Sequence, residues 1–328
     1  MKLNLKQLAL AVAVAAVALS VAPGAFAQQD YPNKPVKIIV GYVPGGGPDF
    51  VARTLGKELT KILGQPFVVE NRPGAGATTA TAYVAKAPAD GYTLLLGETG
   101  QLVVAPYIYK NLQYDTAKDF APISMLGRGA LILVSNSKLP IRNMQDLIRE
   151  AKARPGKIDV GTSGVGTIHH IALEVLKADA GLEMMHIPYK GSGQSVSAIL
   201  AGDVPILLTS GTAASAHITA GKLNLLATTS ASRRPDYPDV PSLSEFVKDY
   251  DYSSEMGLLA PAGLPPEVMA KLSRAVKQAM ESPDLVESFR QTGTIRIYTT
   301  PEEYAENIRR NLKKYERAVK IAKIPLIE

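Results

Sequence analysis

Hydrophobic positions repeat with two different spacings from about residue 36 to the end of the chain. Short β-branched or aliphatic runs predict buried strands, and longer segments with an apolar residue every three or four positions predict amphipathic helices. In the clearest helix, 50–63, the residues Val51, Leu55 and Leu59 share one face and Gly64 follows as a stop signal. The predicted strands are 36–40, 67–69, 92–96, 131–135, 159–161, 185–188 and 206–209, and the predicted helices are 50–63, 78–86, 144–153, 168–178 and 195–201, with about the last 60 residues mostly helical.

Strands that alternate with helices predict an α/β fold, in which parallel strands are joined by helical crossovers. Two longer extended stretches, 123–135 and 255–260, interrupt this alternation. We interpret them as crossings between two Rossmann-like domains. The sequence therefore predicts a discontinuous first domain (28–125 plus 256–328) and a second domain (126–255), with a hinged cleft between them.

The first 27 residues have the pattern of a signal peptide. Lys2 and Lys6 precede an apolar run over 8–21, and Ala25-Phe26-Ala27 fits a cleavage site. A buried N-terminal helix is the alternative. We expect export to the periplasm with cleavage near Ala27/Gln28, and no lipid anchor, because no cysteine follows the cleavage point.

Composition excludes several classes of function. The 36 Lys and Arg residues exceed the 30 Asp and Glu residues only slightly and are spread along the chain, whereas a nucleic-acid-binding protein needs a clustered basic face. The chain has no cysteine, which excludes disulfides, thiolate metal sites and a thiol nucleophile.

Three glycine-rich turns each follow a predicted strand and precede a predicted helix. They are 45–49, 161–167 and 191–193. Such turns present free backbone N–H groups and the positive end of a helix, which attract an anion. The alternative is that they are ordinary turns in which Asp49 and Thr167 are N-caps. Because the three turns fall on both predicted domains, we favour an anion site in the cleft.

No motif for a cofactor or for catalysis is complete. A dinucleotide fingerprint would require glycine where His169 and Phe50 stand, and no Walker lysine follows either turn. The nucleophile elbow of a serine hydrolase fails because Val165 replaces its last glycine. We therefore expect no cofactor and no enzymatic activity, with an exported hydrolase built on Ser163 as the alternative.

The four histidines do not predict a metal site. His169 and His170 are adjacent, so on a helix they point about 100° apart, and no His-x-x-x-His pair occurs. Structural roles are favoured for His186 and His217. His170 has two open roles, a structural one and contact with a bound carboxylate.

An ordered set of motifs resembles the Bug family of solute-binding proteins, which serve tripartite tricarboxylate transporters. The resemblance runs through the whole mature chain. It is carried by Tyr31-Pro32-x-Lys34-Pro35, Pro44-Gly45-Gly46-x-x-Asp49, the segment 69–76, Ala89-Asp90-Gly91-Tyr92-Thr93-Leu94, Gly164-x-Gly166-Thr167-x-x-His170, His186-x-Pro188-Tyr189-Lys190-Gly191-Ser192, Ala220-Gly221-Lys222-Leu223, the segment 257–263 and Thr300-Pro301-Glu302-Glu303.

This resemblance implies a fold like that of type II periplasmic binding proteins and a cleft that captures a small carboxylate without catalysis. It implies delivery to membrane transporter subunits, and we expect a monomer. Signalling to a membrane sensor is the alternative that the sequence leaves open. The ligand-binding residues implied are Tyr42, Gly45, Gly46, Gly47, Pro48, Asp49, Thr162, Ser163, Gly164, Thr167, His170, Gly191, Ser192, Thr209 and Ser210.

Two departures from the family pattern concern the ligand. Pro48 stands where the family usually has a small or hydroxyl residue, which removes an N–H donor from the first loop. Leu208-Thr209-Ser210 stands where the family commonly has Phe-Asp-Asn, which removes an acid. A longer or aromatic dicarboxylate is a ligand that these changes permit.

Overall fold

The computed structural model describes residues 31–327, and residues 34–328 form one compact unit. The predicted signal peptide therefore lies outside the described residues. No helix in the described part of the chain is both long enough and apolar enough to cross a bilayer.

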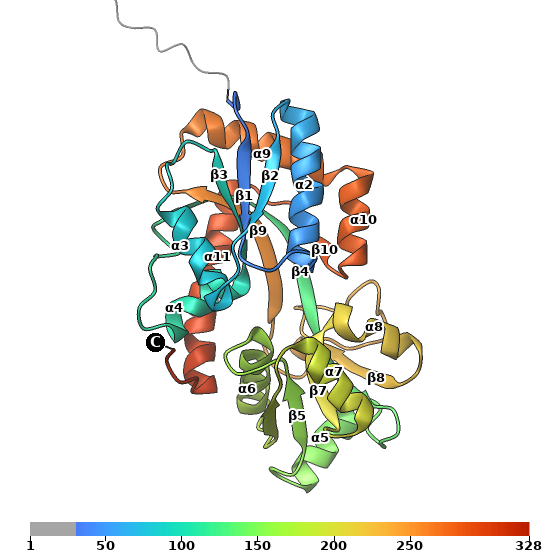
Figure 1. The fold of residues 1–328 in the computed structure, drawn as a ribbon. Coiled ribbons are helices and arrows are strands. Elements are labelled where there is room, and N and C mark those ends of the chain that lie inside the picture. The colour runs from blue at the N-terminus through green and yellow to red at the C-terminus, as the bar shows by residue number, and fades with distance from the viewer. Residues whose placement is uncertain (1–30, 328) are drawn as a thin grey trace, which may run out of the picture. The chain divides into compact units, whose positions relative to one another are not determined.

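The first section of the sheet contains the N-terminal strands (Figure 1). Strand β1 (Val36–Val40) pairs in parallel with β2 (Phe67–Asn71) and with β3 (Thr93–Glu98), so the carboxyl ends of all three strands lie at the same edge. β3 then pairs antiparallel with β9 (Ser253–Pro261), and β9 pairs antiparallel with the first half of β4 (Phe120–Asn136).

The second section of the sheet is built on the other half of β4. β7 (Ile206–Ser210) and β8 (Leu223–Thr228) both pair antiparallel with β4. β5 (Asp159–Thr162) pairs in parallel with β7 and with β6 (Met185–Pro188). Strand β4 thus belongs to both sections, and Figure 1 shows it in green, running from one section to the other beside β9.

The α/β fold is confirmed, but the sheet is mixed rather than purely parallel. β4 and β9 run antiparallel to their neighbours, and the short β10 (Ile295–Arg296) also pairs antiparallel with β4. The two extended stretches of the sequence are these strands, and both are longer than predicted. Parallel pairing was expected because helices separate most of the predicted strands, whereas β4 and β9 pair antiparallel with strands that are distant in the chain.

The helices follow the predicted pattern closely. In α2 (Gly47–Leu63) the predicted face is buried, since Val51, Leu55 and Leu59 have no exposed surface. Gly64 ends α2 in the left-handed conformation, with φ of 73°. The other helices are η1 (Ala75–Ala77), α3 (Thr78–Ala85), η2 (Gly100–Val104), α4 (Ala105–Ile108), α5 (Met144–Ala153), α6 (Ile168–Ala180), α7 (Ser192–Ala201), α8 (Gly211–Thr219), η3 (Leu243–Glu245), α9 (Pro266–Met280), α10 (Pro283–Gln291) and α11 (Pro301–Ala322).

The C-terminal helices pack on different partners. α9 and α10 contact α2, whereas α11 contacts β4, η2 and also α6. The side chain of Tyr304 on α11 is buried against Gly257 of β9. The division into two domains at about residues 125 and 255 stays a prediction, and α11 touches segments from both of them.

Asp49, the N-cap of α2 under the alternative interpretation of its turn, does not cap the helix. The helix begins two residues before Asp49, so its N-cap is Gly46, and the Asp49 carboxylate instead accepts a hydrogen bond from the backbone N–H of Gly45 at 2.9 Å. Thr167 does cap α6, as the alternative interpretation of its turn has it, since the Thr167 side chain accepts from the N–H of His170. The sequence also missed α4, α8 and β8.

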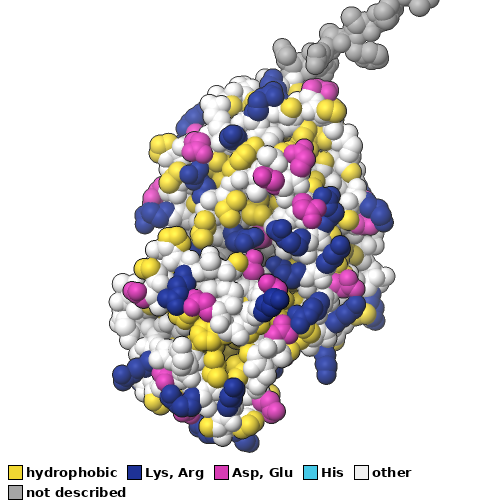
Figure 2. Space-filling view, turned by 180° about the vertical axis from the view of Figure 1, so that it is seen from behind, with side chains coloured by type: hydrophobic (Ala, Val, Ile, Leu, Met, Phe, Trp, Pro, Cys, Tyr) yellow, Lys and Arg dark blue, Asp and Glu magenta, His cyan; other side chains and the backbone are white. Residues whose placement is uncertain are grey.

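Charged side chains are paired over much of the surface. On α11, Arg309 pairs with Glu306 and Lys320 with Glu316, while Arg317 reaches Asp179 at the end of α6. In Figure 2, basic and acidic side chains lie interspersed over the face that is visible.

Candidate functional site

Two adjoining cavities lie where the turns after several strands come together. The first has a volume of about 470 Å³ and the second about 410 Å³, within the range of small-molecule sites. Glu98 and Ser254 line both, so the cavities meet at these two residues. Among residues 31–327, no lysine or arginine lines either cavity.

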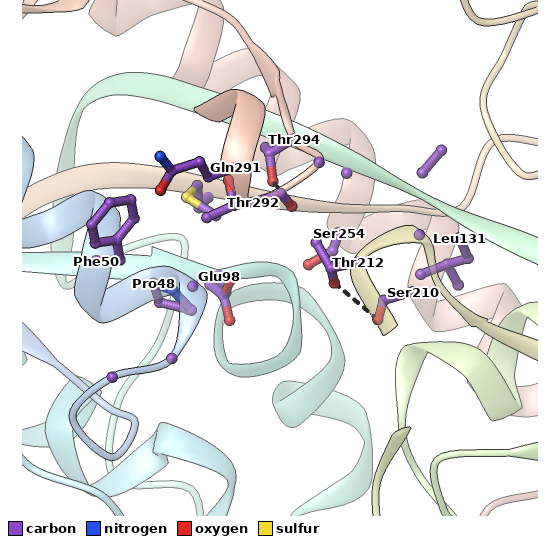
Figure 3. Close-up of a pocket in the computed structure, with 18 residues that line it drawn as sticks. Pro48, Phe50, Glu98, Leu131, Ser210, Thr212, Ser254, Gln291, Thr292 and Thr294 are labelled. Carbon is purple, nitrogen blue, oxygen red and sulfur yellow. Dashed lines mark hydrogen bonds between the residues drawn. The ribbon is translucent and has the colours of Figure 1, made fainter. Parts of the chain in front are cut away.

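The first glycine-rich turn forms one wall of the first cavity. Gly45, Gly46, Gly47 and Pro48 all line it, at the positive end of α2 (Figure 3). Gly45 has a φ of 87°, a conformation that a residue with a side chain rarely adopts. The turn can therefore bring backbone close to a ligand.

Asp49 holds this turn in place from behind. Its carboxylate accepts from Gly45 N–H, from Arg53 at 3.0 and 2.9 Å, and from Asn71 at 2.8 Å. Burial alone would raise the pKa of Asp49, but the hydrogen bonds from Arg53, Gly45 and Asn71 hold it below its usual value. An acceptor this fully occupied supports the loop and is not available to a ligand.

The opposite wall of the first cavity comes from distant parts of the chain. Ser210 and Thr212 lie at the start of α8 and share a hydrogen bond of 3.3 Å. The turn 291–294 after α10 and the β4 residues 129–131 complete the lining. Figure 3 shows Glu98 between Pro48 on one side and Ser254 on the other.

The second glycine-rich turn lines the second cavity. Ser163, Thr167 and His169 face it, together with Tyr42 from the end of β1. Ile168 and His169 are the first two residues of α6, and their N–H groups have no carbonyl partner within the helix. The cavity therefore contains a helix N-terminus that suits an anion.

The Thr167 hydroxyl is already committed within this turn. It donates to the carbonyl of Gly164 at 2.7 Å and accepts from the N–H of His170 at 3.3 Å. Its single proton is used, so it cannot also donate to a carboxylate. The geometry favours the helix cap over direct ligand contact for this side chain.

Ser163 and His169 form a close pair, with 2.6 Å between Oγ and Nδ1. Burial lowers the pKa of His169 to about 4, so its ring is neutral at neutral pH. Its Nε2 is buried and has no partner among the described residues. The pair therefore lacks the acid that orients the histidine of a catalytic triad.

Glu98 is the acid at the meeting point of the two cavities. Burial raises the pKa of its carboxyl to about 7, although the neighbouring Tyr42 hydroxyl acts in the opposite direction. The hydroxyl of Tyr42 in turn donates to Gln101 at 3.2 Å. A carboxyl group here affects the charge that any ligand meets.

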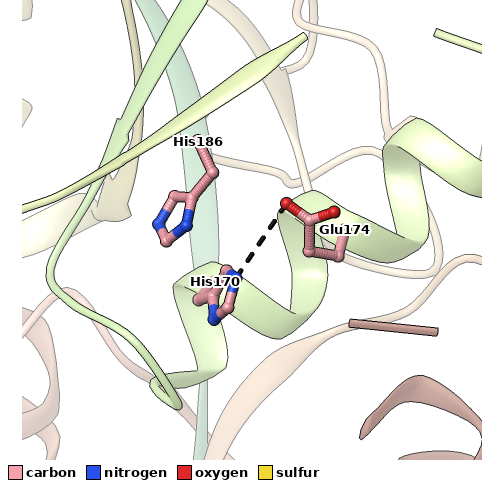
Figure 4. A group of neighbouring side chains, drawn as sticks. All are labelled: His170, Glu174 and His186. Atoms are coloured by element: carbon pink, nitrogen blue, oxygen red, sulfur yellow. Dashed lines mark ion pairs between the residues drawn. The ribbon is translucent and has the colours of Figure 1, made fainter. Parts of the chain in front are cut away.

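His170, His186 and Glu174 lie close together behind the second turn (Figure 4). The two rings are stacked, with centroids 4.0 Å apart and planes 13° apart. A metal ion lies in the plane of each imidazole that binds it, so parallel stacked rings do not point at one ion. Glu174 is also held by Lys177 at 2.8 Å, His170 Nδ1 accepts from Gly166 N–H, and His186 Nε2 bonds Thr162 Oγ1. The cluster joins β5 and β6 to α6.

Eight of the predicted binding residues line the cavities and seven do not. The eight are Tyr42, Gly45, Gly46, Gly47, Pro48, Ser163, Thr167 and Ser210. Those outside both linings are Asp49, Thr162, Gly164, His170, Gly191, Ser192 and Thr209.

Packing inside the protein explains why most of these seven residues do not line a cavity. Thr162 and Thr209 are fully buried, and His170 is 7% exposed. Gly191 donates its N–H to the Ser163 carbonyl at 3.0 Å, so the third turn supports the second one.

The sequence analysis missed Glu98, Ser254 and the turn 291–294. Glu98 had a signal, because Gly97-Glu98-Thr99-Gly100 follows a predicted strand of the same parallel group. Ser254 and the turn 291–294 had none, since nothing local links them to the other loops.

Comparisons with known proteins agree with this architecture. A model of the tripartite tricarboxylate transporter family receptor matches residues 51–324. The protein BugT of Bordetella pertussis is 36% identical over 275 residues, 83% of this chain and 84% of BugT. A Cupriavidus necator protein named for the gbd 5' region is 35% identical over 311 residues, 94% of each chain.

Solved structures with a similar fold agree with these sequence matches. The periplasmic binding protein BugD has a TM-score of 0.73 and 30% identity, covering 90% of this chain and all of BugD. An R. palustris protein determined with adipate has a TM-score of 0.77 and 30% identity, covering 91% of this chain and all of that one. MatC of Rhodopseudomonas palustris, with bound malate, has a TM-score of 0.71 and 27% identity, covering 88% and 100%.

Proposed function

The chain belongs to the tripartite tricarboxylate transporter receptor family of periplasmic solute-binding proteins, and we propose that it captures a small carboxylate where its two cavities meet and delivers it to a membrane transporter. Two relatives of known structure hold adipate and malate, which are both dicarboxylates. A carboxylate is therefore the ligand class that we assign to this cleft.

The observation that carries the proposal is the convergence of two helix N-termini on one space. The start of α2 lines the first cavity and the start of α6 lines the second, and Glu98 and Ser254 join the two. Backbone N–H groups at helix N-termini bind anions without a basic side chain. This suits a protein that must release its ligand again.

Because of Pro48, the first loop offers a ligand fewer backbone N–H donors than the second loop. Proline has no N–H to offer, and Asp49 already occupies the N–H of Gly45, so the first loop has few free donors. We therefore propose that the start of α6 holds a ligand carboxylate directly, and that ordered water bridges the ligand to the first loop.

Hydrolysis is the second candidate, because Ser163 and His169 are in contact. The missing acid argues against it, as does the orientation of the ring, which presents Nδ1 to the serine. Generic ester substrates test this directly, and we expect no turnover above the rate in buffer.

A thermal-shift experiment tests carboxylate capture. Small carboxylates and their methyl esters are compared at equal concentration with the mature protein, residues 28–328. We expect the carboxylate that binds to stabilise the protein by about 2.7 kcal/mol at 100 times its Kd, and its ester not to do so. Equal stabilisation by acid and ester would contradict an anion site.

A further inference from the structure

We infer that Glu98 makes this cleft select a carboxylate that also carries a protonated nitrogen, such as an amino acid, over a simple dicarboxylate. The inference rests on the proposed carboxylate capture and narrows its ligand class. Glu98 ends β3, pairs in register with Met256 of β9, and lines both cavities. Any ligand that spans the meeting point of the cavities must pass beside this carboxyl group.

Among residues 31–327, no cationic side chain pairs with Glu98. Lysine and arginine are absent from both linings within the described residues. Charged groups on the neighbouring elements are paired with each other: Arg53 with Asp49 on α2, and Arg128 of β4 with Glu255 of β9.

The other titratable groups around Glu98 are neutral at neutral pH. Tyr42, which follows β1, and Tyr304 of α11 both have a pKa raised by burial, with the Glu98 charge adding to the shift. His169 of α6, the histidine in the second lining, has its pKa lowered to about 4 by burial. The counter-charge for an ionised Glu98 must therefore come from the ligand or from a proton.

A ligand that carries a carboxylate and an ammonium group fits both ends of this site. Its carboxylate meets the free N–H groups of Ile168 and His169 at the start of α6, and its ammonium group meets Glu98. A dicarboxylate would instead place a second anion beside Glu98 inside the cleft, and like charges repel each other. It would have to bind with a proton on Glu98.

The two cases have opposite pH dependence. Burial raises the pKa of the Glu98 carboxyl to about 7 before a ligand binds. An ammonium group lowers that pKa in the complex, so binding releases protons and affinity rises as pH increases from about 6 to about 8. A dicarboxylate raises the pKa, so binding takes up protons and affinity falls over the same range.

Calorimetric titration of matched ligand pairs tests the inference. The pairs are aspartate and succinate, glutamate and glutarate, and 4-aminobutyrate and butyrate. Each is titrated at about pH 6 and about pH 8 in two buffers of different ionisation heat, which gives the number and sign of protons exchanged. We expect the amino member of at least one pair to bind more tightly, with proton release.

Variants assign the preference to Glu98. In Glu98→Gln the affinity for the amino ligand should fall about 10- to 100-fold, because a charged hydrogen bond is lost, while its partner without nitrogen should bind equally or more tightly. Glu183→Gln removes an exposed carboxylate that lies outside both linings, and should change neither affinity.

The titrations distinguish failure of the inference from failure of the proposed carboxylate capture. Tighter binding of the members without nitrogen, with proton uptake, would overturn the inference and leave carboxylate capture standing. An amino-ligand preference that survives in Glu98→Gln would also overturn it. Absence of binding by every member of every pair would overturn the inference together with the assignment of small carboxylates as ligands. If Glu98→Gln fails to fold, the titrations of the unmodified protein still test the inference.

Discussion

At the scale of single residues, the ionised carboxyl of Glu98 lowers the free energy of unfolding. Burial raises the pKa of its carboxyl from the ordinary value of 4.5 to about 7, so the folded state binds the proton more tightly than the unfolded state. The unfavourable contribution is absent below about pH 4.5 and complete above about pH 7. A carboxyl group kept in such a place is consistent with a role in binding.

Glu98→Gln should therefore stabilise the protein in a pH-dependent way. We expect an increase of up to about 3 kcal/mol in the free energy of unfolding at about pH 8, and little change at about pH 4.5. Urea denaturation of the ligand-free protein at both pH values measures this. The same difference at both pH values would show that the fold does not raise the pKa of the Glu98 carboxyl, and Glu183→Gln is the control.

Substitution of Thr167 tests whether its hydroxyl caps α6 or contacts the ligand. Thr167→Val removes the cap of α6 and the bond to Gly164, which should cost about 1 kcal/mol of stability. The ligand affinity should change less than the 5- to 150-fold expected for loss of a direct bond to a charged group. Denaturation and calorimetry on the same sample separate the two effects. Thr167→Ser keeps the hydroxyl and should restore both properties.

At the scale of elements, the position of α11 is set by a glycine in β9. A Cβ added at Gly257 would collide with the ring edge and the hydroxyl of Tyr304, whose side chain is 2% exposed. Glycine in a strand normally weakens it, so its presence here serves the close approach of the helix to the sheet.

Gly257→Ala should destabilise the protein by about 1–3 kcal/mol, because the helix or the strand must shift to admit one methyl group. Gly193→Ala is a matched control in the first turn of α7, where an added Cβ meets no atom within 4 Å. It should be neutral or stabilise by a few tenths of a kcal/mol. Thermal unfolding of the two variants measures the difference, and equal melting temperatures would contradict the packing of α11 on β9.

At the scale of the whole molecule, the two predicted domains meet across the first cavity. Thr212 belongs to the middle segment and Gly293 to the C-terminal segment, and a Cβ at Gly293 would lie 3.2 Å from the Thr212 methyl group. The chain has no cysteine of its own, which makes a designed crosslink unambiguous.

A disulfide between Thr212→Cys and Gly293→Cys should slow ligand association if the domains must separate to admit the ligand. Reduction should raise the association rate again, and the reduced double variant is the reference, because both positions line the first cavity. Stopped-flow measurement of ligand association before and after reduction tests this. An unchanged rate in the oxidised protein would mean that entry needs no movement between these two segments.

Local pattern predicted most of the elements correctly. The strand 36–40 and the helices 144–153 and 50–63 were recognisable because the spacing of their apolar residues is a property of each segment alone. The turns 45–48 and 163–167 were found for the same reason, since glycine next to a strand marks its own position in the chain. The family resemblance depended on these same local motifs.

Only the tertiary structure decided which of these residues share a site. Glu98 and Ser254 are 156 positions apart in the numbering, and they meet because β3 and β9 pair antiparallel in one register. Asp49 and Thr167 looked like candidate ligand contacts, but their hydrogen bonds turn inward to Gly45 and Gly164. The physical reason is that strand pairing and hydrogen-bond partners depend on groups far away in the chain, whereas periodicity depends only on near neighbours.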